Sequence, residues 1–132
     1  MNINCIIAGG RDFTNYDSLK KAMATVKFGN NDVTIISGTA RGADSLGERY
    51  ASENKLEIKR FPANWNKYGK AAGPIRNKEM LEQANCVICF WDGKSRGTKN
   101  MIEITKEAGK PIAVFNYDGT LKEYQKKGEK HG

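Results

Sequence analysis

Histidine is almost absent from this chain, and cysteine and long hydrophobic runs are scarce. The single histidine, His131, lies near the end of the chain, which argues against a histidine-based metal site or a catalytic triad. No apolar run approaches the about 18 residues of a membrane-spanning helix, and residues 1–8 lack the basic start and long apolar stretch of a secretory signal. We therefore expect a cytoplasmic protein without a membrane partner, a bound metal or a cofactor.

The three cysteines do not form a recognisable disulfide framework. Cys86 and Cys89 have the spacing of a redox CxxC motif, but they stand inside an apolar run, whereas redox motifs open a helix that stabilises the thiolate. Side chains alternate along a strand, so the two should point to opposite faces of a sheet. We interpret them, together with Cys5, as buried structural residues.

Acidic residues are fewer than basic ones, 15 against 22, which gives a formal net charge of +7. Such an excess is typical of proteins that meet nucleic acid or other polyanions, although it also describes an ordinary solvated surface. The segment after residue 117 is nearly neutral, so the excess lies in the body of the chain. At 132 residues the chain fits a single domain.

Short apolar runs alternate with helical patterns along the chain. The runs occupy residues 3–8, 33–37, 56–61, 86–90 and 112–116, and the third is polar enough to predict an edge strand. Helical spacing of apolar residues covers 19–26, 43–51 and 98–108, with a weaker pattern at 74–84. This order predicts an α/β fold, a Rossmann-like three-layer sandwich with a mainly parallel five-stranded sheet. We expect the domain to span residues 1–117, followed by a basic, polar tail, residues 118–132, with at most a short helix at 121–126.

Four loops that follow predicted strands contain both glycine and basic residues: 8–13, 37–44, 62–77 and 91–98. Loops of this kind share the carboxyl edge of a parallel sheet, where ligands bind. Glycine lets the backbone approach a ligand, and a following helix N-terminus favours an anion. The basic residues are Arg11, Arg41, Lys67, Lys70, Arg76, Lys94 and Arg96, against Asp12, Asp44 and Asp92. We therefore predict a site for an anionic ligand.

The ligand-binding residues that we predict come from all four loops. They are Gly9, Gly10, Arg11, Asp12, Ser37, Gly38, Arg41, Gly42, Asp44, Trp65, Lys70, Arg76, Asn77, Asp92, Gly93, Lys94, Ser95, Gly97 and Thr98. The arginines suit phosphate, and Trp65 either stacks on a base or simply packs on the sheet edge as part of a covering flap. No loop has the spacing of a P-loop or of the dinucleotide fingerprint.

Several of these residues also have an ordinary structural explanation. Arg11 could pair with Asp12 in a tight turn, and Thr98 could simply cap a helix. Asp44 is either a first-turn carboxylate favoured by the helix dipole or a group that accepts from a ribose hydroxyl or orients Arg41. The sequence leaves these alternatives open.

Taken together, the four segments resemble the SLOG superfamily, and in particular its small YspA/YpsA-like members. The segments are residues 9–13 (GGRDF), 37–44 (SGTARGAD), 69–80 (GKAAGPIRNKEM) and 91–98 (WDGKSRGT), and the likeness extends over residues 2–116. The resemblance implies a Rossmann-like fold that binds nucleotides or nucleotide-derived ligands, in some members as sensors in prokaryotic defence. It also implies a homodimer or a higher homo-oligomer.

Two branches of the superfamily suggest alternative functions. The Lonely Guy phosphoribohydrolases release a base from nucleoside monophosphates, and residues 76–80 resemble their Arg-Lys-x-x-Met motif, with Asn77 in place of the lysine. Residues 92–101 resemble their glycine-rich motif in part, but Met101 stands where those enzymes have a glutamate, and Glu103 lies some ~200° further round the helix.

Glycosidic cleavage needs a carboxylate at the sugar, so we expect sensing or sequestration of the ligand, with hydrolysis as the alternative. Candidate catalytic residues for that alternative are Asp12, Asp44, Asp92 and Arg76. A second alternative is single-stranded DNA binding, as in the DNA-processing protein A branch. Because the basic residues gather around one loop cluster, we expect only weak, non-specific binding of nucleic acid.

Overall fold

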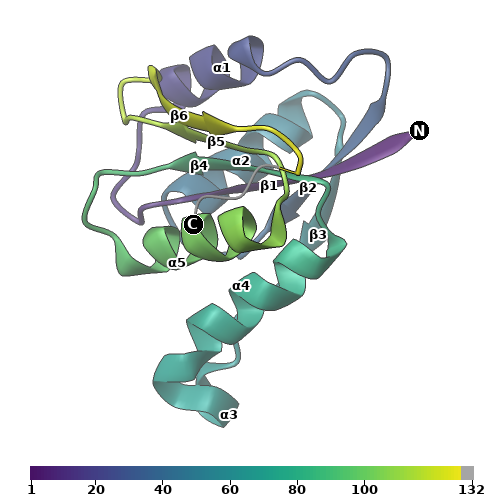
Figure 1. Cartoon of the computed structure of the whole chain (residues 1–132). Helices are drawn as coiled ribbons and strands as arrows, with labels where there is room; N and C mark the ends of the chain where they lie inside the picture. The colour runs from purple at the N-terminus through teal and green to yellow at the C-terminus, as the bar shows by residue number, and fades with distance from the viewer. Residues whose placement is uncertain (129–132) are drawn as a thin grey trace.

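A six-stranded sheet in the order β3-β2-β1-β4-β5-β6 forms the centre of the computed structural model, which describes residues 1–128 (Figure 1). The strands are β1 (Asn2–Gly9), β2 (Asp32–Ser37), β3 (Glu57–Arg60), β4 (Cys86–Phe90), β5 (Ile112–Phe115) and β6 (Leu121–Gln125). The first five strands are parallel, and β6 runs antiparallel to β5. The mainly parallel α/β sheet is confirmed, with β3 at one edge as predicted and with one strand more than predicted.

Helices cover both faces of this sheet, which confirms the three-layer arrangement (Figure 1). On one face pack α1 (Tyr16–Thr25) and α2 (Ala43–Glu53); on the other pack α4 (Ala72–Gln83) and α5 (Arg96–Ala108). Strand side chains alternate between the two cores, so the apolar run of β1 sends Cys5 and Ile7 to the first core and Ile6 and Ala8 to the second. None of the helices within residues 1–128 is long and apolar enough to cross a membrane.

The sixth strand corrects the expectation of a short helix at residues 121–126. The chain reverses after β5 in a turn in which Asn116 N donates to Thr120 O at 2.9 Å and Asp118 Oδ1 accepts from Thr120 N at 2.9 Å. Gly119 adopts a φ of 87° there, so the Asp-Gly pair acts as a hairpin signal. The remaining residues, 129–132, include His131 and lie outside the described part of the chain.

The connection after β3 is also more regular than the long loop predicted at residues 62–77. It contains α3 (Trp65–Tyr68), the 3-10 helix η1 (Gly69–Ala71) and the first turn of α4. Asn64 makes this possible as the N-cap of α3, because its Oδ1 accepts from Lys67 N at 3.1 Å. Pro74 lies in the first turn of α4, as predicted.

The cysteines are free, and their placement confirms the interpretation from the sequence. Cys5 and Cys89 are buried and Cys86 is partly buried. Cys86 packs with the core on the α1 side, whereas Cys89 belongs to the core on the α5 side. Strand alternation therefore separates the two cysteines of the CxxC spacing.

Candidate functional site

A pocket of about 930 Å³ lies beyond the carboxyl ends of the parallel strands. The loops after β1, β2, β3 and β4 all contribute to it, which confirms that they share one edge of the sheet. β1 has β2 on one side and β4 on the other, so the pocket lies at the point where the strand order reverses. Of the residues predicted from the sequence, those that line the pocket are Gly9, Gly10, Arg11, Asp12, Arg41, Asp44, Trp65, Lys70, Arg76, Asn77, Asp92, Lys94, Ser95, Gly97 and Thr98.

Four predicted ligand-binding residues do not line the pocket: Ser37, Gly38, Gly42 and Gly93. Ser37 is buried, and its hydroxyl donates to Glu48 Oε2 at 2.7 Å. Gly42 has a φ of 78°, and a Cβ there would lie 2.4 Å from Gly10 O, so glycine is required by the contact between the first two loops. These residues shape the loops around the pocket.

Asp44 is the buried carboxyl group of the pocket. It lies in the first turn of α2, which agrees with the first of the two explanations offered for it from the sequence. Its Oδ2 accepts a hydrogen bond from Ala40 N at 3.1 Å. Burial raises the pKa of Asp44 to about 6, although the Ala40 N–H, Arg76 and Arg11 all act to lower it. A carboxyl group with this pKa can donate or accept a hydrogen bond near neutral pH. Among the described residues it forms no ion pair with Arg41.

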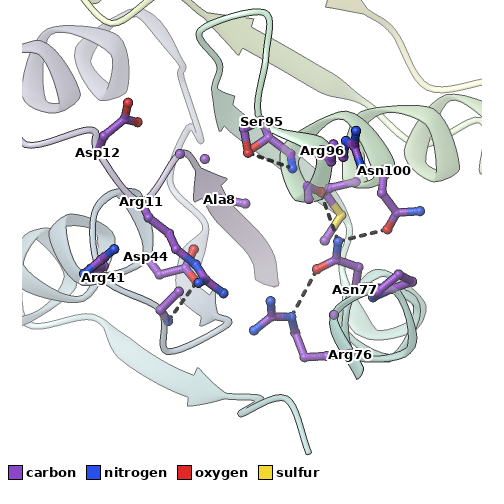
Figure 2. A pocket seen from close by; sticks show the side chains of 18 of the residues that line it. Ala8, Arg11, Asp12, Arg41, Asp44, Arg76, Asn77, Ser95, Arg96 and Asn100 are labelled. Atoms are coloured by element: carbon purple, nitrogen blue, oxygen red, sulfur yellow. Dashed lines mark hydrogen bonds between the residues drawn. The ribbon is translucent and has the colours of Figure 1, made fainter. Parts of the chain in front are cut away.

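Arg76 is held by backbone carbonyl groups at the strand ends. Its Nη1 donates to Gly38 O, with a longer contact of 3.5 Å to Phe61 O. Its Nε donates to Asn77 Oδ1 at 3.1 Å (Figure 2). The carbonyl groups belong to residues that follow β2 and β3, so the side chain ties α4 to both strands. These bonds explain how a cation is accommodated near a helix N-terminus, where the dipole is unfavourable. Burial lowers the pKa of Arg76.

Asn77 joins α4 to the start of α5. This buried side chain donates from Nδ2 to Gly97 O at 3.2 Å and to Asn100 Oδ1 at 3.0 Å (Figure 2). Its Oδ1 already accepts from Arg76, so its polar atoms are bonded to other parts of the pocket wall. Asn77 therefore positions its neighbours.

The loop after β4 presents the N-terminus of α5 to the pocket. Asp92 Oδ1 accepts from Lys94 N at 2.8 Å and from Ser95 N at 2.9 Å, and these bonds lower the pKa of Asp92. Gly93 provides the turn, with a φ of 84°.

The N-cap of α5 is Ser95, which corrects the alternative that gave this place to Thr98. The Ser95 side chain accepts from Thr98 N at 3.5 Å. The N–H groups of Arg96 and Gly97 have no side-chain partner among residues 1–128, and both residues line the pocket. They remain available to an anion.

Asp12 is turned toward a neighbouring tyrosine. Tyr117 donates its hydroxyl hydrogen to Asp12 Oδ1 at 2.6 Å, and burial together with this bond raises the pKa of Tyr117. In Figure 2 Arg11 points toward Asp44, whereas Asp12 points the opposite way. Arg11 and Asp12 form no ion pair among the described residues, so the pairing expected for a simple tight turn is absent there.

Positive charge dominates the pocket lining, which has six cationic side chains, one of them Arg76, and three acidic ones. The other five cationic side chains make no hydrogen bond or ion pair with residues 1–128; they are Arg11, Arg41, Lys70, Lys94 and Arg96. Lys67, predicted with this group, lies outside the pocket, with its Nζ 5.1 Å from the centre of the Tyr68 ring. Within the described chain no group of three or more His, Cys, Asp or Glu residues could hold a metal ion. The excess of cationic over acidic side chains in the lining favours an anion.

The pocket also contains Arg96, which was predicted only as one of the basic residues of the anion site. Residues that the sequence did not assign to the site at all are Ala8, Ala40, Gly73, Pro74, Met80, Asn100 and Met101. Asn100 follows Arg96 by one helical turn, and this spacing was the available signal. Met101 is almost fully buried, at the position where the Lonely Guy enzymes have a glutamate. Glu103 is exposed and lies outside the pocket, and its Oε1 is 4.0 Å from Lys99 Nζ.

Comparisons with known proteins agree with this architecture. The profile of the YspA, cpYpsA-related SLOG family matches residues 4–68. The chain is 31% identical over 108 residues to the Gene 61 protein of Mycobacterium phage D29, a match that covers 77% of this chain and 84% of the phage protein. No solved structure matches the chain at a significant level. On these matches, the chain belongs to the YspA, cpYpsA-related SLOG family.

Proposed function

We propose that the pocket binds a nucleotide or a nucleotide-derived phosphate ligand, cyclic or of the ADP-ribose type among others, in order to sense or sequester it. The family supports nucleotide-related binding or processing in general. The observation that carries the proposal is that five cationic side chains of the pocket make no hydrogen bond or ion pair within residues 1–128, while the N-terminus of α5 opens on the same pocket. Such an arrangement favours phosphate by charge and by directed N–H groups together.

The chemistry of the carboxyl groups favours binding over cleavage. Asp12 is bonded to Tyr117, and Asp92 accepts two N–H groups of its own loop. Met101 supplies an apolar wall where the related hydrolases have a carboxylate. A ligand with a phosphate group would therefore bind without a carboxylate at the position that the hydrolases use for cleavage.

Calorimetry tests the proposal. The purified protein is titrated with mononucleotides, dinucleotides, cyclic nucleotides and ADP-ribose, and at least one should bind more tightly than ~1 mM, or about −4 kcal/mol. Arg96→Ala should weaken that ligand about tenfold or more, because a charge-assisted hydrogen bond contributes ~1.5–3 kcal/mol. Lys78→Ala is the matched control, since Lys78 is exposed on α4 and does not line the pocket. Binding weaker than ~1 mM for every ligand would refute the proposal.

A second candidate function is hydrolysis of the N-glycosidic bond of a nucleoside monophosphate. One observation favours it: Asp44 is a buried carboxyl group in the pocket with a pKa of about 6. Values near neutrality suit a general acid or base. Incubation with AMP and related monophosphates should release little free base. Robust release that Asp44→Asn abolishes would make hydrolysis the function.

The proposal also covers the oligomeric state of the protein and its binding of nucleic acid. We expect a homodimer or a higher homo-oligomer, because two-fold assemblies are the commonest in general. We expect single-stranded nucleic acid to bind weakly, because the unpaired cations surround one pocket and do not follow a track. Sedimentation at tens of micromolar protein checks the first expectation, and a monomer would contradict it.

A further inference from the structure

The segment between β3 and α4, residues 62–71, folds without burying any side chain. It contains α3 and η1, and Figure 1 shows α3 at the far end of α4, away from the sheet. Asn64 caps α3, so the segment has a defined shape although it adds nothing to the core. Surface segments on a rigid scaffold often carry binding residues, which directs attention to the exposed aromatic residues of this one.

Trp65 is the one aromatic side chain within residues 1–128 that lines the pocket, and it is 50% exposed. Its ring lies against the first turn of α4, where a Cβ on Gly73 would stand 3.5 Å from Cη2. A Cβ at this distance would make only ordinary van der Waals contact, so the indole is not crowded at the pocket edge. Tyr68 differs, because it lies outside the pocket with Lys67 over its ring.

The polar side chains that α4 contributes to the pocket wall are poorly placed to read the edge of a base, because they are bonded within the protein. Asn77 is bonded on both its amide oxygen and its amide nitrogen, and Asn100 accepts one of these bonds. Arg76 is bonded to carbonyl groups of the strand ends and to Asn77. An aromatic face, by contrast, accepts any base, because every base has a π-face.

We infer that the base of the bound nucleotide stacks on Trp65 and is recognised by its stacking area, so that purines bind more tightly than pyrimidines while adenine and guanine bind alike. This inference rests on the proposed function, because it assumes that the phosphate of the same ligand binds among the unpaired cations. With a volume of about 930 Å³, the pocket is large enough for a whole mononucleotide and lies within the ~300–1,000 Å³ usual for ligand sites.

The test separates the two ends of the ligand. Calorimetry measures AMP, GMP, CMP and ribose 5-phosphate against the wild-type chain, Trp65→Ala and Trp65→Phe. In the wild type, AMP should bind about 5- to 150-fold more tightly than ribose 5-phosphate, which corresponds to the ~1–3 kcal/mol of one base–aromatic stack. Trp65→Ala should remove most of this ratio while the affinity for ribose 5-phosphate stays unchanged, and Trp65→Phe should keep part of it.

Fluorescence provides a second readout, because the chain has two tryptophans, Trp65 and Trp91. In Trp91→Phe, which leaves Trp65, AMP should quench the emission and ribose 5-phosphate should not. Trp65→Ala should unfold at the same denaturant concentration as the wild type, since the segment contributes no buried side chain.

The possible failures are distinguishable. If the wild type binds AMP but Trp65→Ala leaves the AMP to ribose 5-phosphate ratio unchanged, the inference is wrong and the proposed function stands. A difference of about tenfold or more between AMP and GMP would show reading of the base edge and would also overturn it. If neither the nucleotides nor ribose 5-phosphate bind, the proposed function fails and the inference with it.

Discussion

The carboxyl group of Asp44 and the guanidinium group of Arg76 both lie against the position that a side chain at Gly38 would occupy, without forming a direct ion pair. A Cβ at Gly38 would stand 2.8 Å from Asp44 Oδ2 and 2.5 Å from Arg76 Nη1. Burial raises the pKa of Asp44 and outweighs the lowering effect of Arg76, whose donors are bonded to carbonyl groups and to Asn77. The pocket therefore contains a carboxyl group that titrates close to neutral pH.

This arrangement predicts that ionisation of Asp44 lowers the free energy of unfolding as the pH rises. Its pKa rises from 3.8 to about 6 on folding, so the folded state holds its proton more firmly than the unfolded state. The contribution of Asp44 to stability is fully present below pH 3.8 and is lost as the pH rises through about 6. The free energy of unfolding of Asp44→Asn, measured relative to that of the wild type, should therefore rise by roughly 1–3 kcal/mol from pH 4.5 to pH 7.5. Urea unfolding at the two pH values measures it, with the exposed Asp17→Asn as control. An equal change at both pH values would contradict the prediction.

A separate prediction concerns Arg76 as a structural link between α4 and the strand ends. Arg76→Ala should lower the free energy of unfolding by about 2 kcal/mol or more, because it leaves carbonyl groups without their donor and Asp44 without a nearby cation. Arg76→Lys should lower it less, since the charge remains. Arg49→Ala removes an exposed arginine paired with Glu53 and should cost at most ~1 kcal/mol in the same denaturant titration. Equal effects for Arg76 and Arg49 would show that the link contributes little.

The sixth strand makes residues beyond 117 matter for stability. A chain that ends after Tyr117 lacks β6 and its backbone bonds to β5, so its free energy of unfolding should fall by about 2 kcal/mol or more at ~1 kcal/mol for each bond. Glu123→Ala keeps β6 and removes the ion pair with Lys106, so it should change the stability by less than ~1 kcal/mol. Thermal or chemical unfolding of the two proteins measures the difference. If both behave alike, β6 is dispensable.

Salt dependence should separate a pocket ligand from nucleic acid. The log affinity for a single-stranded oligonucleotide should fall steeply with log salt, through counterion release, whereas that of a mononucleotide held by directed hydrogen bonds should fall much less. One titration of each ligand at low and at high salt gives both slopes. An oligonucleotide that binds far more tightly than any mononucleotide at physiological salt would favour the DNA-binding alternative.

Much of the fold followed from local patterns. The apolar runs predicted all five parallel strands, and the polar run at 56–61 predicted that β3 lies at an edge. We expected a polar tail after residue 117, because the residues that form β6 include few apolar ones, and the hairpin signal of the Asp118-Gly119 pair was missed. Pairing with β5 formed β6 from residues whose own pattern is weak.

The sequence by itself determined which loops lie at one sheet edge, since the position of each glycine and the alternation of strands and helices along the chain are local properties. Parallel pairing then brings these loops together. Tertiary structure alone decided which side chains are free. Arg11 and Arg76 look alike in the sequence, but Arg76 meets carbonyl groups from two strand ends while Arg11 meets no hydrogen-bond or ion-pair partner within residues 1–128. Such partners lie far from the arginine in the sequence, so no local pattern predicts them. Only tertiary packing determines whether a cationic side chain is bonded within the fold or remains available to a ligand.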